Sequence, residues 1–286
     1  MATAGREGPA EHRPEPQSRT WASVPLTVSV FVILATLLGV SALAWALTLR
    51  QGMGGDMLVG LTSSLSRASE GMHPEMGMGM AMGAPLFVGM WATMMVAMMF
   101  PSVAPMVLAH WRLSAGRRQG PLAVPLFVGG YLVSWTAIGV AAYGAYRGLL
   151  ALAPTLSGRA AGMVAGATLT GAGVYQLSRF KTVCLSHCRS PVQFFLHWRP
   201  GLAGALRMGV GHGFYCVGCC WGLMLVLFVV GVMNLVWMGV LAAVIFVEKV
   251  APFGWRMAKG VGVALIAAGL GVALFPAVLG TGLLGG

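Results

Sequence analysis

The stretch PLTVSVFVILATLLGVSALAWALTL, residues 25–49, decides the fold class of this chain. It contains no charged residue, and about 20 apolar residues suffice for a helix to cross the hydrocarbon core of a bilayer. Ala42-Leu43-Ala44 resembles a signal-peptidase site, but the apolar run is longer than the ~7–15 residues of a signal-peptide core. We therefore expect an uncleaved transmembrane helix.

The composition of the whole chain agrees with this interpretation. Of the 286 residues, 57% are hydrophobic and 9% are charged, and the mean hydropathy is +0.81. A water-soluble domain with this composition would lack the polar groups needed to cover its surface. The net charge of +11 comes from basic residues spread singly between apolar runs, so we expect a lipid bilayer and no nucleic acid as partner.

Seven stretches are long and apolar enough to be spans, which predicts an all-α, polytopic transmembrane helix bundle. They form one domain, residues 25–286, after a disordered cytoplasmic tail at residues 1–24. Only Gly231 and Asn234 separate the fifth and sixth spans, so six spans with a re-entrant segment are an alternative. The predicted spans are residues 25–49, 84–110, 122–146, 160–178, 209–231, 234–250 and 260–279.

The distribution of Lys and Arg predicts the orientation of the bundle. The tail and the connections after the second, fourth and sixth spans hold 14 of these 18 residues. Positively charged connections are retained in the cytoplasm. We therefore expect the N-terminus inside, the C-terminus outside and the connection at residues 50–83 outside.

The fifth span carries the most informative motif, GVGHGFYCVGCCW at residues 209–221. On a helix, His212, Cys216 and either Cys219 or Cys220 follow one another at spacings of three or four, so one face presents an imidazole and several sulfurs. Thiolates are soft ligands that select Cu(I), Zn(II) or an iron–sulfur cluster, and a bound cation offsets the cost of burying them. Buried cysteine also serves as a small hydrophobe, but three within five residues favour a metal site.

A second candidate site is KTVCLSHCRSP at residues 181–191, in a predicted cytoplasmic connection. Cys184 and Cys188 are four residues apart with His187 between them. The flanking basic residues are expected to lower the thiol pKa values, which favours metal capture and disulfide exchange alike. Metal binding and a redox-active or structural pair therefore stay open as alternatives.

Methionine is concentrated in one part of the chain, with 13 of the 20 lying between Met53 and Met106. Thioethers bind Cu(I) without losing a proton, even outside the membrane where thiols would oxidise. We interpret the external loop at residues 50–83 as a copper-recruiting segment, with a low-complexity linker as the alternative. Its candidate ligands are Met72, His73, Met76, Met78, Met80 and Met82.

The second span continues the methionine pattern. Met94, Met95, Met98 and Met99 pair one turn apart and form a sulfur-rich stripe. Such stripes are more often adaptable packing than ligands. If this stripe lies opposite the cysteines of the fifth span, it could supply the remaining thioethers of a buried site.

Glu248 and Lys249 adjoin at the predicted inner end of the sixth span. A carboxylate within the membrane is costly and is therefore a functional candidate by default. Because a lysine follows it at the membrane interface, we interpret this glutamate as an anchor or as one half of an ion pair between helices.

These motifs resemble a family of bacterial integral membrane proteins of unknown function that are predicted to bind metal and are described as copper-chaperone-like. The resemblance covers about residues 86–260 and does not reach the tail or the Met-rich loop. It implies a helical domain in the bacterial inner membrane with a metal site. The motifs that carry it are MWATMMVAMMFP at residues 90–101, GYLVSW at 130–135, the stretch 181–191 and CVGCCW at 216–221.

Together these features predict a non-enzymatic membrane protein that binds a soft metal. Cu(I) is the expected ion, with zinc as the alternative, and delivery to a cuproenzyme or to another copper chaperone is the expected role. One alternative is a membrane thiol–disulfide oxidoreductase that passes electrons between Cys216/Cys219 and Cys184/Cys188. The other is a structural or assembly subunit of a membrane complex.

Overall fold

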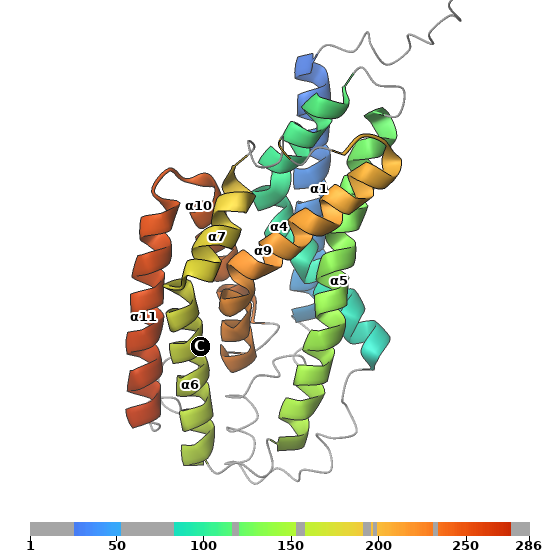
Figure 1. Cartoon of the computed structure of the whole chain (residues 1–286). Helices are drawn as coiled ribbons and strands as arrows, with labels where there is room; N and C mark the ends of the chain where they lie inside the picture. Colours follow the sequence, from blue (N-terminus) through green and yellow to red (C-terminus); the bar gives the residue numbers. More distant parts are fainter. Residues whose placement is uncertain are drawn as a thin grey trace, which may run out of the picture.

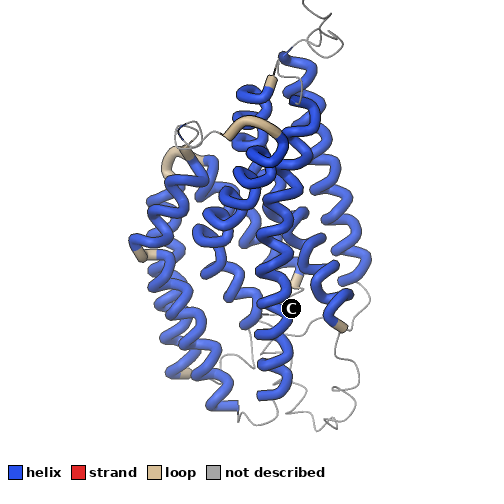
Figure 2. The backbone as a smooth tube through the Cα atoms, turned by 45° about the vertical axis from the view of Figure 1, so that its right-hand side comes forward, coloured by secondary structure: helices blue, strands red, loops and turns tan. Residues whose placement is uncertain are grey.

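Every element in the described part of the chain is an α-helix, as the computed structural model in Figures 1 and 2 shows. The structure describes residues 26–52, 83–115, 120–152, 158–190, 196, 199–230 and 234–275. The all-α prediction is thereby confirmed for these residues. The helices are α1 (Leu26–Gly52), α4 (Ala84–Ser114), α5 (Gly120–Leu152), α6 (Gly158–Gln176), α7 (Arg179–Arg189), α9 (Leu202–Val230), α10 (Leu235–Val250) and α11 (Gly254–Leu274).

Five of these helices, α1, α4, α5, α9 and α11, are long and apolar enough to cross a membrane. The other two predicted spans are helical but shorter, with 19 residues in α6 and 16 in α10. At about 1.5 Å per residue, 16 residues rise about 24 Å, less than the ~30 Å of a hydrocarbon core. The structure supports a polytopic membrane protein, while the number of seven spans and the inside position of the N-terminus stay predictions.

The break expected between the fifth and sixth spans is present. Helix α9 ends at Val230 and α10 begins at Leu235. Asn234 caps α10, because its side-chain oxygen accepts a hydrogen bond from the backbone N–H of Trp237 at 3.1 Å. This residue therefore ends the connection and starts a new helix.

Glycines let two pairs of helices approach backbone to backbone. A Cβ at Gly166 of α6 would lie 2.5 Å from the carbonyl oxygen of Gly269 in α11, and the two helices run side by side in Figure 1. In the same way, a Cβ at Gly209 of α9 would collide with the carbonyl of Phe127 in α5. Small residues at such crossings are the usual means by which membrane helices pack closely.

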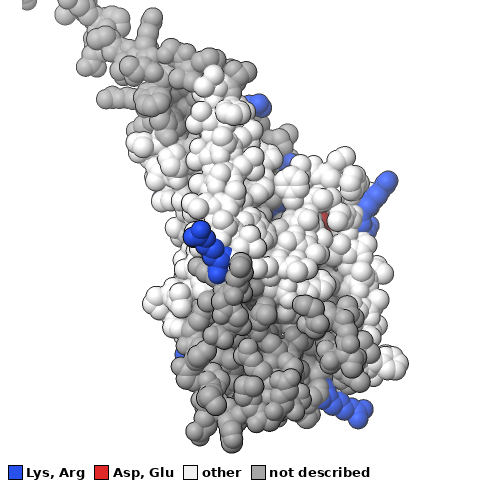
Figure 3. All heavy atoms as spheres, turned by 180° about the vertical axis from the view of Figure 1, so that it is seen from behind, with Lys and Arg blue, Asp and Glu red and all other residues white. Residues whose placement is uncertain are grey.

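The buried core lies where α4, α5 and α9 meet. Large side chains that are almost fully buried there include Met94, Met98, Trp135 and Leu223. Large apolar side chains also cover the outside, where Phe31 is 71% and Val236 is 74% exposed. Figure 3 shows few charged side chains among the described residues on one face of the molecule, which fits contact with lipid tails.

Helix α7 is the short element that lies beside α9 and α10 rather than forming a separate connection (Figure 1). Ser178 caps its first turn by accepting a hydrogen bond from the backbone N–H of Lys181 at 3.2 Å. At its other end, Arg189 donates hydrogen bonds to the carbonyl oxygens of Glu248 and Ala251. The hydrogen bonds of Arg189 thus tie the end of α7 to the end of α10.

Candidate metal centre

Three thiols of α9 converge at one point in the core. The Sγ atoms of Cys216, Cys219 and Cys220 all lie within 4.8 Å of one another, and each side chain is 1% exposed. Two sulfurs bound to one ion at about 2.3 Å stand at most about 4.6 Å apart. The three thiols are therefore nearly at ligand spacing already, as the helical repeat of three and four residues predicts.

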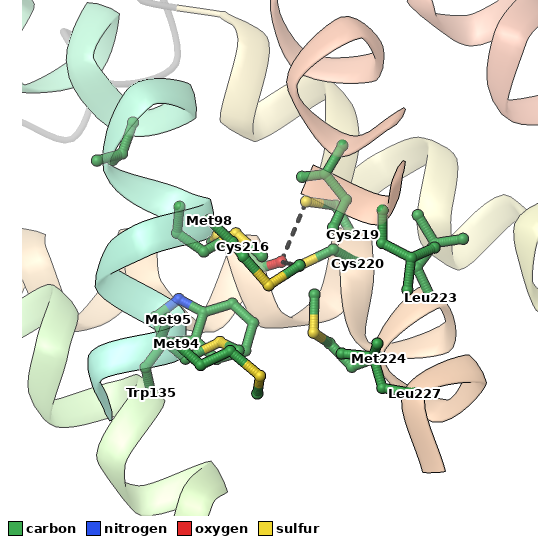
Figure 4. Close-up of a cluster of buried hydrophobic side chains, with 14 of the residues drawn as sticks. Met94, Met95, Met98, Trp135, Cys216, Cys219, Cys220, Leu223, Met224 and Leu227 are labelled. Carbon is green, nitrogen blue, oxygen red and sulfur yellow. Dashed lines mark hydrogen bonds between the residues drawn. The ribbon is translucent and has the colours of Figure 1, made fainter. Parts of the chain in front are cut away.

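Backbone hydrogen bonds hold two of these thiols in place. The Sγ of Cys219 donates to the carbonyl oxygen of Cys216 at 3.1 Å, and the Sγ of Cys220 donates to the same oxygen at 2.8 Å (Figure 4). A shared acceptor orients both side chains towards the same region.

A fourth sulfur comes from α7. The Sγ of Cys188 lies 3.7 Å from that of Cys219, and its side chain is 7% exposed. The two sites that the sequence analysis treated separately therefore meet at this pair. We refer to Cys188, Cys216, Cys219 and Cys220 as the sulfur centre. The five cysteines of the chain are all free thiols.

Cys184 lies one turn before Cys188 on α7 and is partly exposed. Its sulfur occupies the space beside Gly218, where an added Cβ would stand only 2.6 Å away. The lack of a side chain at Gly218 thus lets α7 approach α9. The expectation that flanking basic residues lower the thiol pKa values is wrong for Cys184, because partial burial and the nearby Cys219 raise its pKa.

Among the described residues, neither predicted imidazole ligand, His187 or His212, belongs to the three-cysteine group. His187 stacks on Tyr215, with ring centroids 4.3 Å apart. His212 is buried, with its ring between Phe127 at 5.9 Å and Tyr131 at 6.1 Å. Both histidines are held by aromatic neighbours, so in this conformation sulfur dominates the site.

The methionines of α4 are buried in the same core. Met94, Met95, Met98 and Met99 are between 0 and 2% exposed. Figure 4 shows the first three on α4, in one cluster with the cysteines of α9. Met224, one turn after Cys220 on α9, joins this cluster and was missed by the sequence analysis, although its spacing of four from Cys220 was a usable signal.

Two further polar groups contact the sulfur centre and were also missed. The Nζ of Lys249 lies 2.9 Å from the Sγ of Cys216, and the hydroxyl of Tyr131 lies 3.0 Å from the same sulfur. Lys249 is 8% exposed, so its side chain is buried in the protein, while its position at the membrane interface stays a prediction. Its side chain extends from α10 into the core, because α10 packs against α4 and α9.

Glu248 forms the ion pair between helices that the sequence analysis expected. Its Oε2 lies 2.6 Å from the Nζ of Lys181 on α7, and its Oε1 accepts a hydrogen bond from Gln176 at 2.7 Å. Lys181 also donates to the side-chain oxygen of Gln176. All three side chains are buried, so this network joins α6, α7 and α10 and helps to hold Cys188 against α9.

Residues 53–82 of the Met-rich loop lie outside the described part of the chain, as does the tail at residues 1–24. The interpretation of that loop as a copper-recruiting segment stays a prediction. The ligands concerned are Met72, His73, Met76, Met78, Met80 and Met82.

The donor set of the described site fits a soft metal ion. Its atoms are thiol sulfurs, with thioether sulfurs nearby, and thiolate with thioether is the combination that Cu(I) prefers. The nearest carboxylate on α10, that of Glu248, is already engaged by Lys181 and Gln176. The arrangement can hold a soft cation out of contact with water.

Comparison with known proteins agrees with this chemistry. A family model described as "PpoB2: Copper chaperone" matches residues 88–272, well over half of the chain. The match includes the described methionine stripe and every cysteine of the sulfur centre. No match was found among curated proteins or among solved structures. The resemblance to a copper-chaperone-like family is thereby confirmed, and the chain belongs to the PpoB2 copper chaperone family.

Proposed function

We propose that this protein binds Cu(I) at the sulfur centre, within the bacterial inner membrane, and passes the ion to a cuproenzyme or to another copper chaperone. The observation that carries the proposal is the convergence of three buried thiols of α9 with a fourth from α7. Membership of a copper chaperone family supports copper as the cargo.

The ligand types favour Cu(I) over zinc. Four thiolates also form a common zinc site, so the preference for Cu(I) depends on the thioethers beside the thiols. Thioethers of α4 lie in the same cluster as the thiols (Figure 4). A neutral thioether is a good ligand for Cu(I) and a poor one for Zn(II).

The positions of the cysteines also suggest a route by which the ion is exchanged. Cys184 is partly exposed, Cys188 lies one helical turn further on, and Cys219 follows at 3.7 Å. An ion can move along such a series by binding the next sulfur before it leaves the last one. No step then requires a bare ion in an apolar environment, which would be very costly.

The test is metal loading of the full chain in lipid nanodiscs under anaerobic conditions. Wild-type protein should retain Cu(I) after passage over a desalting column. The triple variant Cys216→Ser, Cys219→Ser, Cys220→Ser should lose it. Cys184→Ser leaves the sulfur centre complete and should still retain the ion, whereas its loading should be slower because Cys184 lies on the proposed route. Full copper retention by the triple variant would refute the proposal.

Thiol–disulfide exchange is a second candidate, because the sulfurs of Cys188 and Cys219 are already 3.7 Å apart. In that reaction these two thiols would become a disulfide while a disulfide in a partner is reduced to two thiols. Trapping of free thiols in cells under oxidising and reducing conditions distinguishes the two functions. A reversible disulfide between Cys188 and Cys219 supports exchange, and thiols that stay reduced under both conditions exclude it.

A further inference from the structure

Lys249 is placed in the core without the usual partner of a buried lysine. The chain has three lysines. Lys181 pairs with Glu248, and Lys259 is exposed, with its Nζ 5.0 Å from the ring of Trp255. Lys249 is 8% exposed, and no carboxylate in the described part of the chain lies within ion-pair distance of its Nζ. Such a charge is costly inside a membrane protein unless another group compensates it.

The Nζ of Lys249 contacts the sulfur centre. The Sγ of Cys216 is nearest at 2.9 Å, followed by the Oγ of Ser102 at 3.4 Å and the Sδ of Met99 at 3.8 Å. An ammonium group has three donors and no acceptor, so the sulfur of Cys216 is the acceptor in this contact. The hydroxyl of Tyr131 lies 3.0 Å from the same sulfur and can donate to it as well. The ammonium of Lys249 and the hydroxyl of Tyr131 therefore both contact this one sulfur in the buried core.

We propose that Lys249 is the counter-cation of an anionic Cu(I)–thiolate centre and thereby sets how tightly the centre holds copper. This inference rests on the proposed function. When Cu(I) binds to Cys216 and to one of its two neighbours on α9, two thiols lose their protons to solvent. The resulting unit, one Cu(I) and two thiolates, carries a net charge of −1. With the ammonium of Lys249 included, the net charge of the buried site is zero.

Charge balance matters here because the site is buried. An uncompensated charge in an apolar core carries a large desolvation cost, whereas a neutral group of charges that touch one another avoids most of it. Lys181 and Glu248 already neutralise each other, so they do not balance the centre. Lys249 is the group that contacts a candidate ligand directly.

The first experiment measures Cu(I) affinity in nanodiscs by competition with a chromophoric Cu(I) chelator. Lys249→Leu removes the charge without adding a sulfur ligand, and it should weaken binding by about tenfold or more, the usual loss for a buried charged hydrogen bond. Lys249→Arg should stay within a few-fold of wild type, because it keeps the charge. Lys259→Leu is the matched control: it removes the same charge from an exposed position and should leave the affinity unchanged.

A second neutral replacement separates charge from hydrogen bonding. Lys249→Gln retains a donor without the charge, so it should weaken Cu(I) binding about as much as Lys249→Leu. It also keeps a polar group towards Ser102 and guards against a Leu variant that fails to fold. Gel filtration and thermal unfolding in the same nanodiscs establish which variants are folded.

A double-mutant cycle with Cys216→Ser tests whether Lys249 acts through this ligand. Without the thiolate of Cys216, Lys249→Leu should cause little further loss of affinity, so the two effects should not add. Fully additive losses, or wild-type affinity in both neutral variants, would overturn the inference while leaving copper binding intact. Wild-type protein that binds no Cu(I) would instead refute the proposed function, and this inference with it.

Discussion

Replacement of Lys181 by Met should detach α7 from the rest of the bundle. Lys181 and Glu248 are 1% and 2% exposed at their side chains and stand 2.6 Å apart. The substitution leaves the carboxylate of Glu248 buried, with Gln176 as its remaining side-chain partner. Removal of one member of a buried ion pair typically costs about 3–5 kcal/mol, because the other charge stays buried without its partner.

A compensating second substitution can show whether the stranded charge causes this loss of stability. The double variant Lys181→Met, Glu248→Gln removes both charges and keeps a neutral amide beside Gln176. It should regain most of the lost stability, since the cost comes from the stranded charge and not from the missing attraction. If the double variant is as unstable as Lys181→Met alone, the cost lies in packing instead.

Two measurements serve as the assay. Equilibrium unfolding in mixed micelles gives the loss of stability, and the rate of alkylation of Cys188 reports whether α7 has left α9. Lys181→Met should raise that rate strongly, because Cys188 is 7% exposed in the packed state. A loss of stability below about 1 kcal/mol, together with an unchanged alkylation rate, would refute the reasoning. An ion pair exposed to solvent contributes no more than about that amount to stability.

Two further predictions concern the packing and the ligands of the site. Gly218→Val should push α7 away from α9, because even a Cβ at this position stands 2.6 Å from the sulfur of Cys184; unfolding measurements should show a loss of about 1–3 kcal/mol. Gly211→Val is its control, since a Cβ there meets nothing within 4 Å, and equal losses in both variants would contradict the packing argument. Met98→Leu conserves volume and should leave stability within about 1.5 kcal/mol of wild type, yet lower Cu(I) affinity in the chelator assay if its thioether binds the ion. Met163→Leu, at a 55% exposed position, should change neither, and a Met98 variant with unchanged affinity would assign that methionine to packing alone.

Local sequence patterns were sufficient for the fold class and for the first three thiols. Charge-free runs such as residues 25–49 require a solvent other than water, and only helices satisfy their own backbone there. Within α9, the spacing of Cys216, Cys219 and Cys220 places their sulfurs on one face, because the helical repeat is known in advance. These inferences depend on one element at a time.

Contacts between helices were decided only by the tertiary structure. The spacing of Cys188 within its own segment does not show that it lies 3.7 Å from Cys219, because that distance depends on Gly218 and on the pair of Lys181 with Glu248. Likewise, the place of Lys249 near the end of its helix suggested an interface residue, whereas the packing of α10 directs its ammonium to Cys216. Helical periodicity determines which side chains share one face of a helix. Which residues of other helices lie against that face depends on how the separate helices pack.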